Sequence, residues 1–227
     1  TLDGECQNDV LAWAAGALEV VSLFEQGAGG APLPVGIAAP GLAARDGSRI
    51  EFMPGRMAGL AGFDWAAFLQ RDVRVLNDAH AALLGEIWRG AAKGLRDVVL
   101  LTLGTGVGGA VVSGGRLLRG HIGRAGHLGH ISLNPHGTPD IANTPGSLED
   151  AIGNVTVARR SAGRFQTTRG LIDAVSLGDP FAEAVWSESV RALAAGITSL
   201  INCFDPACVL LGGGIAAGSR DLLLTPL

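Results

Sequence analysis

The chain has 227 residues, enough for one large domain or two small ones, and 48% of them are hydrophobic, so a sizeable core is available. A formal net charge of −4 and the absence of tyrosine argue against a nucleic-acid-binding surface. The three cysteines, Cys6, Cys203 and Cys208, show no CxxC spacing, which fits a reduced, cytoplasmic setting better than a disulfide framework.

The first part of the chain predicts a helix followed by alternating strands and helices. Asn8 or Asp9 can cap a helix that runs to about Gln26. Its apolar run is too short to cross a bilayer, so we expect a core helix and no membrane partner. The elements that follow are a buried strand at 33–39, a loop at 45–62, a short helix at 64–69, a strand at 73–76 and a helix at 79–93.

The rest of the chain continues this alternation, which is typical of the α/β class. The turn at 113–115 favours a hairpin of the two apolar strands around it. The expected elements are strands at 98–103 and 109–113, a loop at 120–147, a helix at 148–162, a long helix at 181–204, a strand at 208–211 and a turn at 212–214.

Two short segments carry the chemistry. Residues 104–109 follow an apolar strand and read Gly-Thr-Gly-Val-Gly-Gly, a loop in which backbone N–H groups and the Thr105 hydroxyl can approach a phosphate. Taken alone, this loop is equally well explained as a plain turn. Asn77 and Asp78 end another apolar strand, where a carboxylate can take a proton from a sugar hydroxyl, although Asp78 alone is more often a helix N-cap. Together the two segments indicate phosphoryl transfer from a nucleotide to a small polyol.

Five segments, in order, resemble the ROK family of bacterial sugar kinases and sugar-responsive repressors. They are VGIAAPG, VLNDAHAALLGE, LTLGTGVGGAVVSGGRLLRG, AGHLGHISLNP and FDPACVLLGGGIAAGSRDLL. The resemblance implies an α/β fold with two ribonuclease-H-like (actin-like ATPase) domains that flank a cleft. The N-terminal domain, 1–95, would carry the catalytic Asp78, and the C-terminal domain, 96–227, the phosphate, sugar and adenosine-side motifs.

The resemblance also implies a role for each motif residue. Asp78 matches the catalytic base, and the substrate-binding positions are Asn77, His127, His130 and Glu149. The nucleotide-binding positions are Gly104, Thr105, Gly106, Gly108, Gly212, Gly213 and Gly214. The implied activity is ATP-dependent phosphorylation of a hexose at its terminal hydroxyl, with Mg²⁺ bridging the phosphates. A cytoplasmic homodimer is expected, and polyphosphate stays open as an alternative donor.

The chain departs from the family pattern in three places. The superfold usually has a first strand with an Asp-x-Gly-Gly-Thr turn and further C-terminal helices, which these residues lack, so we expect a part of a longer protein or a fold that has lost one phosphate contact. The GExGH motif reads Gly126 to His130, with His127 in place of a sugar-binding Glu, which predicts altered sugar selectivity. The zinc cysteines should fall within 135–147, which contains no Cys, so we expect no structural zinc; a site of His127, His130 and His136 is the less favoured alternative.

Two other functions stay open at this point. A ROK-type transcriptional regulator would keep the sugar site and add a helix-turn-helix, which residues 8–26 do not resemble. A catalytically silent protein would bind sugar without transferring phosphate.

Overall fold

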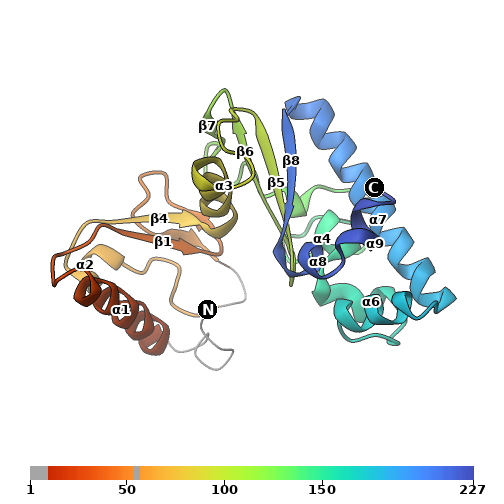
Figure 1. Ribbon diagram of the computed structural model, residues 1–227, viewed down its shortest axis with the longest axis horizontal. Helices are drawn as coiled ribbons and strands as arrows, with labels where there is room; N and C mark the ends of the chain where they lie inside the picture. Colours follow the sequence, from red (N-terminus) through yellow and green to blue (C-terminus); the bar gives the residue numbers. More distant parts are fainter. Residues whose placement is uncertain (1–9, 54–56) are drawn as a thin grey trace. The chain divides into compact units, whose positions relative to one another are not determined.

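The computed structural model describes residues 10–53 and 57–227, which form two compact units (Figure 1). The first unit runs to Ala81 and takes in Arg119–Arg124; the second holds Ala82–Leu118 and Ala125–Leu227. The predicted division after residue 95 therefore differs from this one in the segments 82–95 and 119–124. The predicted caps Asn8 and Asp9, and Cys6, lie outside the described residues.

The first unit is built on a pair of parallel strands. Its elements are α1 (Val10–Gly27), β1 (Val35–Ala39), β2 (Leu42–Ala43), β3 (Ile50–Phe52), α2 (Trp65–Leu69) and β4 (Val73–Asn77). Strands β1 and β4 pair in parallel, with Ala39 opposite Asn77 at their carboxyl ends. Strands β2 and β3 form a small antiparallel ribbon, and β3 falls within the predicted loop at 45–62. The sequence did not predict these strands, because they are too short to show an alternation of apolar and polar residues.

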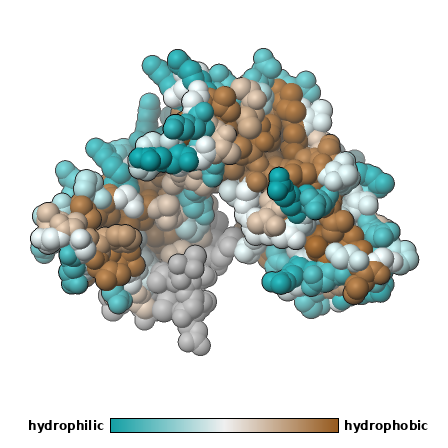
Figure 2. Space-filling view, in the orientation of Figure 1, coloured by the Kyte–Doolittle hydropathy of each residue, from teal (hydrophilic) through white to brown (hydrophobic). Residues whose placement is uncertain are grey.

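Helix α1 is a core helix on one face only. Trp13 and Ala14 are buried and belong to the same apolar cluster as β1 and β4. The expectation of a core helix is wrong for the other face, which exposes Leu18, Val20, Leu23 and Phe24, and Figure 2 shows the apolar surface over α1. Among the described helices, none has the length and apolar character needed to cross a membrane.

The second unit is a mixed sheet with helices on both faces. Its strands are β5 (Val98–Leu103), β6 (Val107–Ser113), β7 (Arg116–Leu117) and β8 (Cys208–Gly212), in the order β7-β6-β5-β8, with β5 and β8 parallel. Its helical segments are α3 (Asp78–Arg89, from Ala82 onward), η2 (Leu128–His130), α4 (Leu148–Ile152), η3 (Asn154–Thr156), α5 (Val157–Arg160), α6 (Thr168–Ser176), α7 (Pro180–Phe204), α8 (Gly213–Gly218) and α9 (Arg220–Leu224).

Strand β5 is buried on both faces, which explains its continuous apolar sequence. Val98 and Leu100 pack with Leu83 of α3, whereas Leu101 packs on the opposite face in the cluster that includes Leu193 of α7. Because α3 covers one face of this sheet, the residues after Ala81 belong to the second unit. The long helix predicted at 181–204 is confirmed as α7, which begins at Pro180 after the N-cap Asp179.

Two predicted turns have different roles in the structure. Strands β5 and β6 do pair in antiparallel fashion, but residues 104–106 join them, and the turn at 113–115 joins β6 to β7 instead. The turn predicted at 212–214 is wrong, because Gly213 begins helix α8 immediately after β8. The three successive glycines at 212–214 did not indicate the start of α8, because glycine has a low helix propensity.

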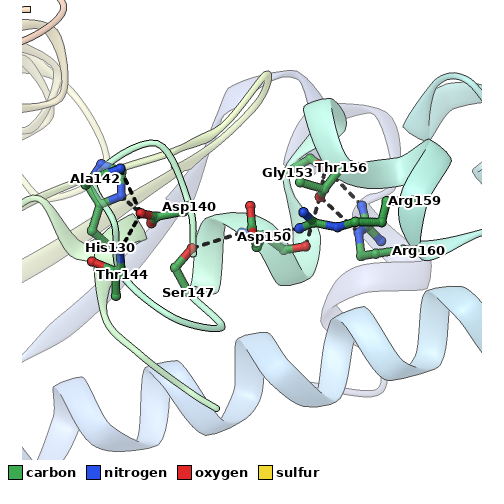
Figure 3. A network of polar contacts seen from close by, with 10 residues as sticks. All are labelled: His130, Asp140, Ala142, Thr144, Ser147, Asp150, Gly153, Thr156, Arg159 and Arg160. Atoms are coloured by element: carbon green, nitrogen blue, oxygen red, sulfur yellow. Dashed lines mark hydrogen bonds and ion pairs between the residues drawn. The ribbon is translucent and has the colours of Figure 1, made fainter. Parts of the chain in front are cut away.

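The helix predicted at 148–162 is interrupted at Gly153. Helix α4 ends there because Gly153 has extended backbone (φ −59°, ψ 149°), and η3 and α5 follow. Arg160 supports this break, because its Nη2 donates to the Gly153 carbonyl at 2.9 Å (Figure 3). Its Nη1 donates to Ser189 Oγ of α7 at 2.6 Å. Burial and, to a lesser extent, the positive charge of neighbouring Arg159 together lower the pKa of Arg160 to about 10. The guanidinium therefore stays charged at neutral pH.

Replacing Arg160 tests how much this bonding stabilises the second unit. We expect Arg160→Ala to lower the free energy of unfolding by about 2–4 kcal/mol, because a buried carbonyl loses a charged donor. Urea denaturation followed by circular dichroism measures the change. Arg159→Ala is the matched control, since Arg159 pairs with Asp150 at the surface, and we expect it to cost less than about 1 kcal/mol. Equal losses in the two variants would contradict the assignment.

Candidate functional site

The loop between β5 and β6 has its carbonyls bound and two of its three amides available, because the Gly104 N–H donates to the Gly106 carbonyl at 2.9 Å. The Gly104 carbonyl accepts the N–H of Asn154 at 3.0 Å, and the Thr105 carbonyl accepts the N–H of Val155 at 2.9 Å. Among the described residues, the N–H groups of Thr105 and Gly106 donate to no protein group, and Thr105 is exposed. The loop therefore offers two amides and a hydroxyl to an anion. Gly108, also a predicted contact, lies within β6 opposite Thr102.

A pocket of about 430 Å³ adjoins this loop within the second unit. It brings together two of the predicted nucleotide segments, since Gly104 and Thr105 line it with Gly214 of α8. The predicted contacts Gly212 and Gly213 are adjacent in sequence to Gly214 but are not among its lining residues. The remaining lining residues are Asn154, Thr168, Arg169, Ile172, Asp173, Ile215, Gly218 and Ser219.

One wall of the pocket was not predicted from the sequence. It comes from α6, whose Arg169 and Asp173 are one turn apart and reach the pocket from the same helix. The Asn154 side chain fixes the start of this helix, because its Oδ1 accepts the N–H of Thr168 at 2.7 Å. The N-cap Thr167, whose side chain accepts the N–H of Gly170, was a usable sequence signal for this helix.

The segment 126–130, called the histidine motif below, packs directly on β6. A Cβ atom at Gly129 would come within 1.8 Å of the Val107 carbonyl oxygen, so only glycine allows this close approach. The turn η2 places His127 at its N-cap and His130 at its end. His130 Nδ1 lies 2.7 Å from Asp140 Oδ2, while the side chain remains 29% exposed.

Glu149 links α4 to the strand that follows the loop at 104–106. It stands in the first turn of α4, after the N-cap Ser147, and its Oε2 accepts the N–H of Val107 at 3.0 Å. The carboxylate also packs against Gly106, where any side chain would displace it. The structure thus brings Glu149 to the loop that was predicted to contact phosphate, in the same unit as His127 and His130.

Asn77 and Asp78 stand in the first unit, at the carboxyl ends of β1 and β4. Asn77 is 5% exposed and is the N-cap of α3: its Oδ1 accepts the N–H of Ala79 (3.0 Å) and of His80 (3.2 Å), and its Nδ2 donates to the Gly41 carbonyl at 3.1 Å. Asp78 is exposed, and its Oδ1 accepts the N–H of Ala79 at 2.9 Å. Asn77 is therefore the main N-cap of α3, and the second carboxylate oxygen of Asp78 remains available to a ligand.

The residues present do not fit the zinc site of the family pattern. The segment 135–147 has no cysteine. In residues 10–53 and 57–227, no three His, Cys, Asp or Glu side chains are grouped so as to hold a metal ion. Mg²⁺ has a lesser requirement, because it is usually bound through one or two carboxylates and the phosphates of a nucleotide.

Comparison with known proteins identifies the family. The ROK family profile matches residues 17–224. The chain is 34% identical over 220 residues to a glucokinase of Thermotoga maritima, covering 85% of this chain and 67% of that protein. It is 34% identical over 199 residues to an N-acetylmannosamine kinase of Escherichia fergusonii, covering 84% and 68%. The chain thus spans about two thirds of the length of these relatives.

A solved structure shows the same fold. It is a ROK family glucokinase from Streptomyces griseus in complex with glucose and AMPPNP, with a TM-score of 0.75 at 28% identity, over 94% of this chain and 76% of that one. The α/β units described above, the glycine loop beside the pocket and these matches agree: the chain belongs to the ROK family.

Proposed function

We propose that the protein uses ATP to phosphorylate a hexose at its terminal hydroxyl, in the manner of a glucokinase. The observation that carries the proposal is the loop at 104–106, whose carbonyls are bound and whose Thr105 and Gly106 amides are available beside a pocket. The relatives named above are kinases, and one was solved with an ATP analogue, which favours a kinase over the regulator and over a silent sugar-binding protein. ADP release in a coupled assay, across a panel of hexoses, tests it directly.

The pocket of the second unit is the proposed nucleotide site. The amides of Thr105 and Gly106 and the Thr105 hydroxyl would hold the transferring phosphate, and Gly214 of α8 would face the adenosine. Asp173 offers an acceptor for a ribose hydroxyl, and Arg169 offers a charged donor. Mg²⁺, when bound with the nucleotide, would neutralise charge on its phosphates.

Asp78 is the proposed general base. Its exposed carboxylate stands at the N-terminus of α3. It would accept the proton of the sugar hydroxyl as the new O–P bond forms. Asn77 orients it by capping the same helix and by binding the carbonyl of Gly41. In the second unit, His127, His130 and Glu149 are the proposed sugar-binding residues.

The sugar preference follows from His127 in this proposal. An imidazole there replaces a carboxylate that accepts hydroxyl hydrogen bonds, so the chain should rank hexoses differently from a glucokinase. Glucose and N-acetylmannosamine are the two sugars that the names of the relatives suggest. The expected homodimer and cytoplasmic location belong to the same proposal, and size-exclusion chromatography with light scattering tests the dimer.

The role of Asp78 is tested by Asp78→Asn. We expect kcat to fall by about 10³-fold while the Kd for sugar changes little, because a general base acts mainly in the transition state. Kinetics by ADP release and sugar binding by calorimetry measure the two effects. Asp72→Asn is the matched control, since Asp72 is exposed just before β4, at the other end of the same strand, and we expect it to be without effect. A near-normal kcat in Asp78→Asn removes this residue from the role of base.

The role of His127 is tested by His127→Glu. We expect the ratio of kcat/KM for glucose over N-acetylmannosamine to rise by about tenfold, because the variant restores a hydroxyl acceptor. His136→Glu, at an exposed position of the same loop, adds the same charge and should leave the ratio unchanged. An unchanged ranking of sugars in His127→Glu would refute this assignment.

A further inference from the structure

The loop that follows the histidine motif is folded around one buried carboxylate. The Asp140 side chain is 1% exposed, and its Oδ1 accepts the N–H groups of Ala142 at 2.8 Å and Thr144 at 2.9 Å (Figure 3). The Asp140 N–H also donates to the Thr144 carbonyl at 2.9 Å. These bonds close the tip of the loop at 139–145, where Pro139 and Pro145 lie opposite each other.

The second oxygen of this carboxylate is committed to His130. Asp140 Oδ2 lies 2.7 Å from His130 Nδ1. A buried carboxylate without a partner would be costly, so the ring and the carboxylate hold each other in place. Among the described residues, His130 Nε2 makes no hydrogen bond to the protein, and the side chain is 29% exposed. The ring is therefore fixed through one nitrogen and available through the other.

The protonation state of Asp140 sets the direction of this hydrogen bond. Burial by itself raises the pKa of Asp140, but hydrogen bonds outweigh it and hold the pKa below the usual value of 3.8. The donors are His130, the backbone of Thr144 and Ala142, and Ser147. An ionised carboxylate only accepts hydrogen bonds, so Nδ1 must carry a proton, and in the neutral form of the ring Nε2 is then the acceptor.

The loop is also fixed at its base, next to Glu149. Ser132 Oγ donates to the Pro145 carbonyl at 2.6 Å, and the N–H of Leu148 donates to the Ile131 carbonyl at 3.0 Å. The segment from His130 to Asp140 thus returns to the start of α4, which carries Glu149. Hydrogen bonds of the chain itself supply cross-links in the segment where the family pattern would place zinc cysteines.

We infer that Asp140 is a positioning residue for the sugar site: its carboxylate holds His130 in the Nδ1–H tautomer and so presents Nε2 as an acceptor for a sugar hydroxyl. The identity of the ligand rests on the proposed function, whereas the tautomer does not. The same contacts make Asp140, rather than a metal, the group that orders the loop at 131–147.

The tautomer is measured on the unmodified chain by ¹⁵N–¹H correlation spectra of its five histidines, with His130→Gln to assign the signal. In the neutral ring we expect the pattern of an Nδ1–H imidazole. We expect Asp140→Asn to lose that pattern and to weaken equilibrium binding of glucose or N-acetylmannosamine by about tenfold, the equivalent of one hydrogen bond. The KM for ATP should stay within about twofold, a separation that general loosening of the fold would not give.

Matched variants separate this role from a loss of charge or of fold. Asp150→Asn removes the same charge from α4, where Asp150 pairs with Arg159, and should leave sugar affinity and the His130 signal unchanged. Asp140→Glu keeps the carboxylate and should restore part of the sugar affinity. Incubation with EDTA should alter neither quantity.

Four results would overturn the inference. They are an Nε2–H tautomer in the unmodified chain, an unchanged sugar Kd in a folded Asp140→Asn, a Kd in Asp150→Asn as weak as in Asp140→Asn, or loss of the His130 pattern on adding EDTA. If Asp140→Asn does not fold, the spectrum of the unmodified chain still decides. A chain that binds sugar with the Nδ1–H tautomer but releases no ADP would refute the proposed kinase and leave the role of Asp140 intact.

Discussion

The chemistry of the second unit depends on two backbone hydrogen bonds, from Asn154 and Val155 to the carbonyls of Gly104 and Thr105. A peptide group is planar, so holding its carbonyl also sets the direction of the amide on its other side. Binding these two carbonyls to η3 leaves the amides of the loop available for an anion. The break in the helix at Gly153 is what places η3 beside the loop, and Arg160 bonds that break to α7.

Helix α4 connects this loop to the segment that carries His130. Its first turn carries Glu149, which accepts the N–H of Val107 just after the phosphate loop. The N–H of Leu148, one residue earlier, bonds to Ile131 next to His130. One short helix thus fixes both Val107, just after the glycine loop, and Ile131, next to His130. A site built from separate loops gains precision from such a shared rigid element, because a displacement in one segment is opposed by contacts of the other.

The sequence was informative where local pattern decides the structure and uninformative where long-range contacts do. The continuous apolar run of β5 predicted that strand well, because burial on both faces leaves a local signal. The boundary between β4 and α3 was predicted well too, because the capping side chain of Asn77 marks it. The break at Gly153 depends on Arg160 and Ser189, which no local pattern reveals. Asp140 was missed for the same reason: it is an ordinary loop aspartate until the fold brings it to His130. The pocket wall from α6 was missed although Thr167 marked its start.

Because Asn77 precedes Asp78, the capping of α3 and the exposed carboxylate are provided by two different side chains. A carboxylate at the start of a helix usually acts as the N-cap and accepts hydrogen bonds from the first amides of the helix, because these amides have no acceptor within the helix. In this chain the buried amide of Asn77 accepts from both Ala79 and His80 and also anchors itself to Gly41. Asp78 then accepts only one of the described amides, and its carboxylate is exposed at the N-terminus of α3. The His130–Asp140 pair is arranged similarly, since the buried Asp140 accepts the structural hydrogen bonds and the more exposed His130 keeps Nε2 unbonded to any of the described residues.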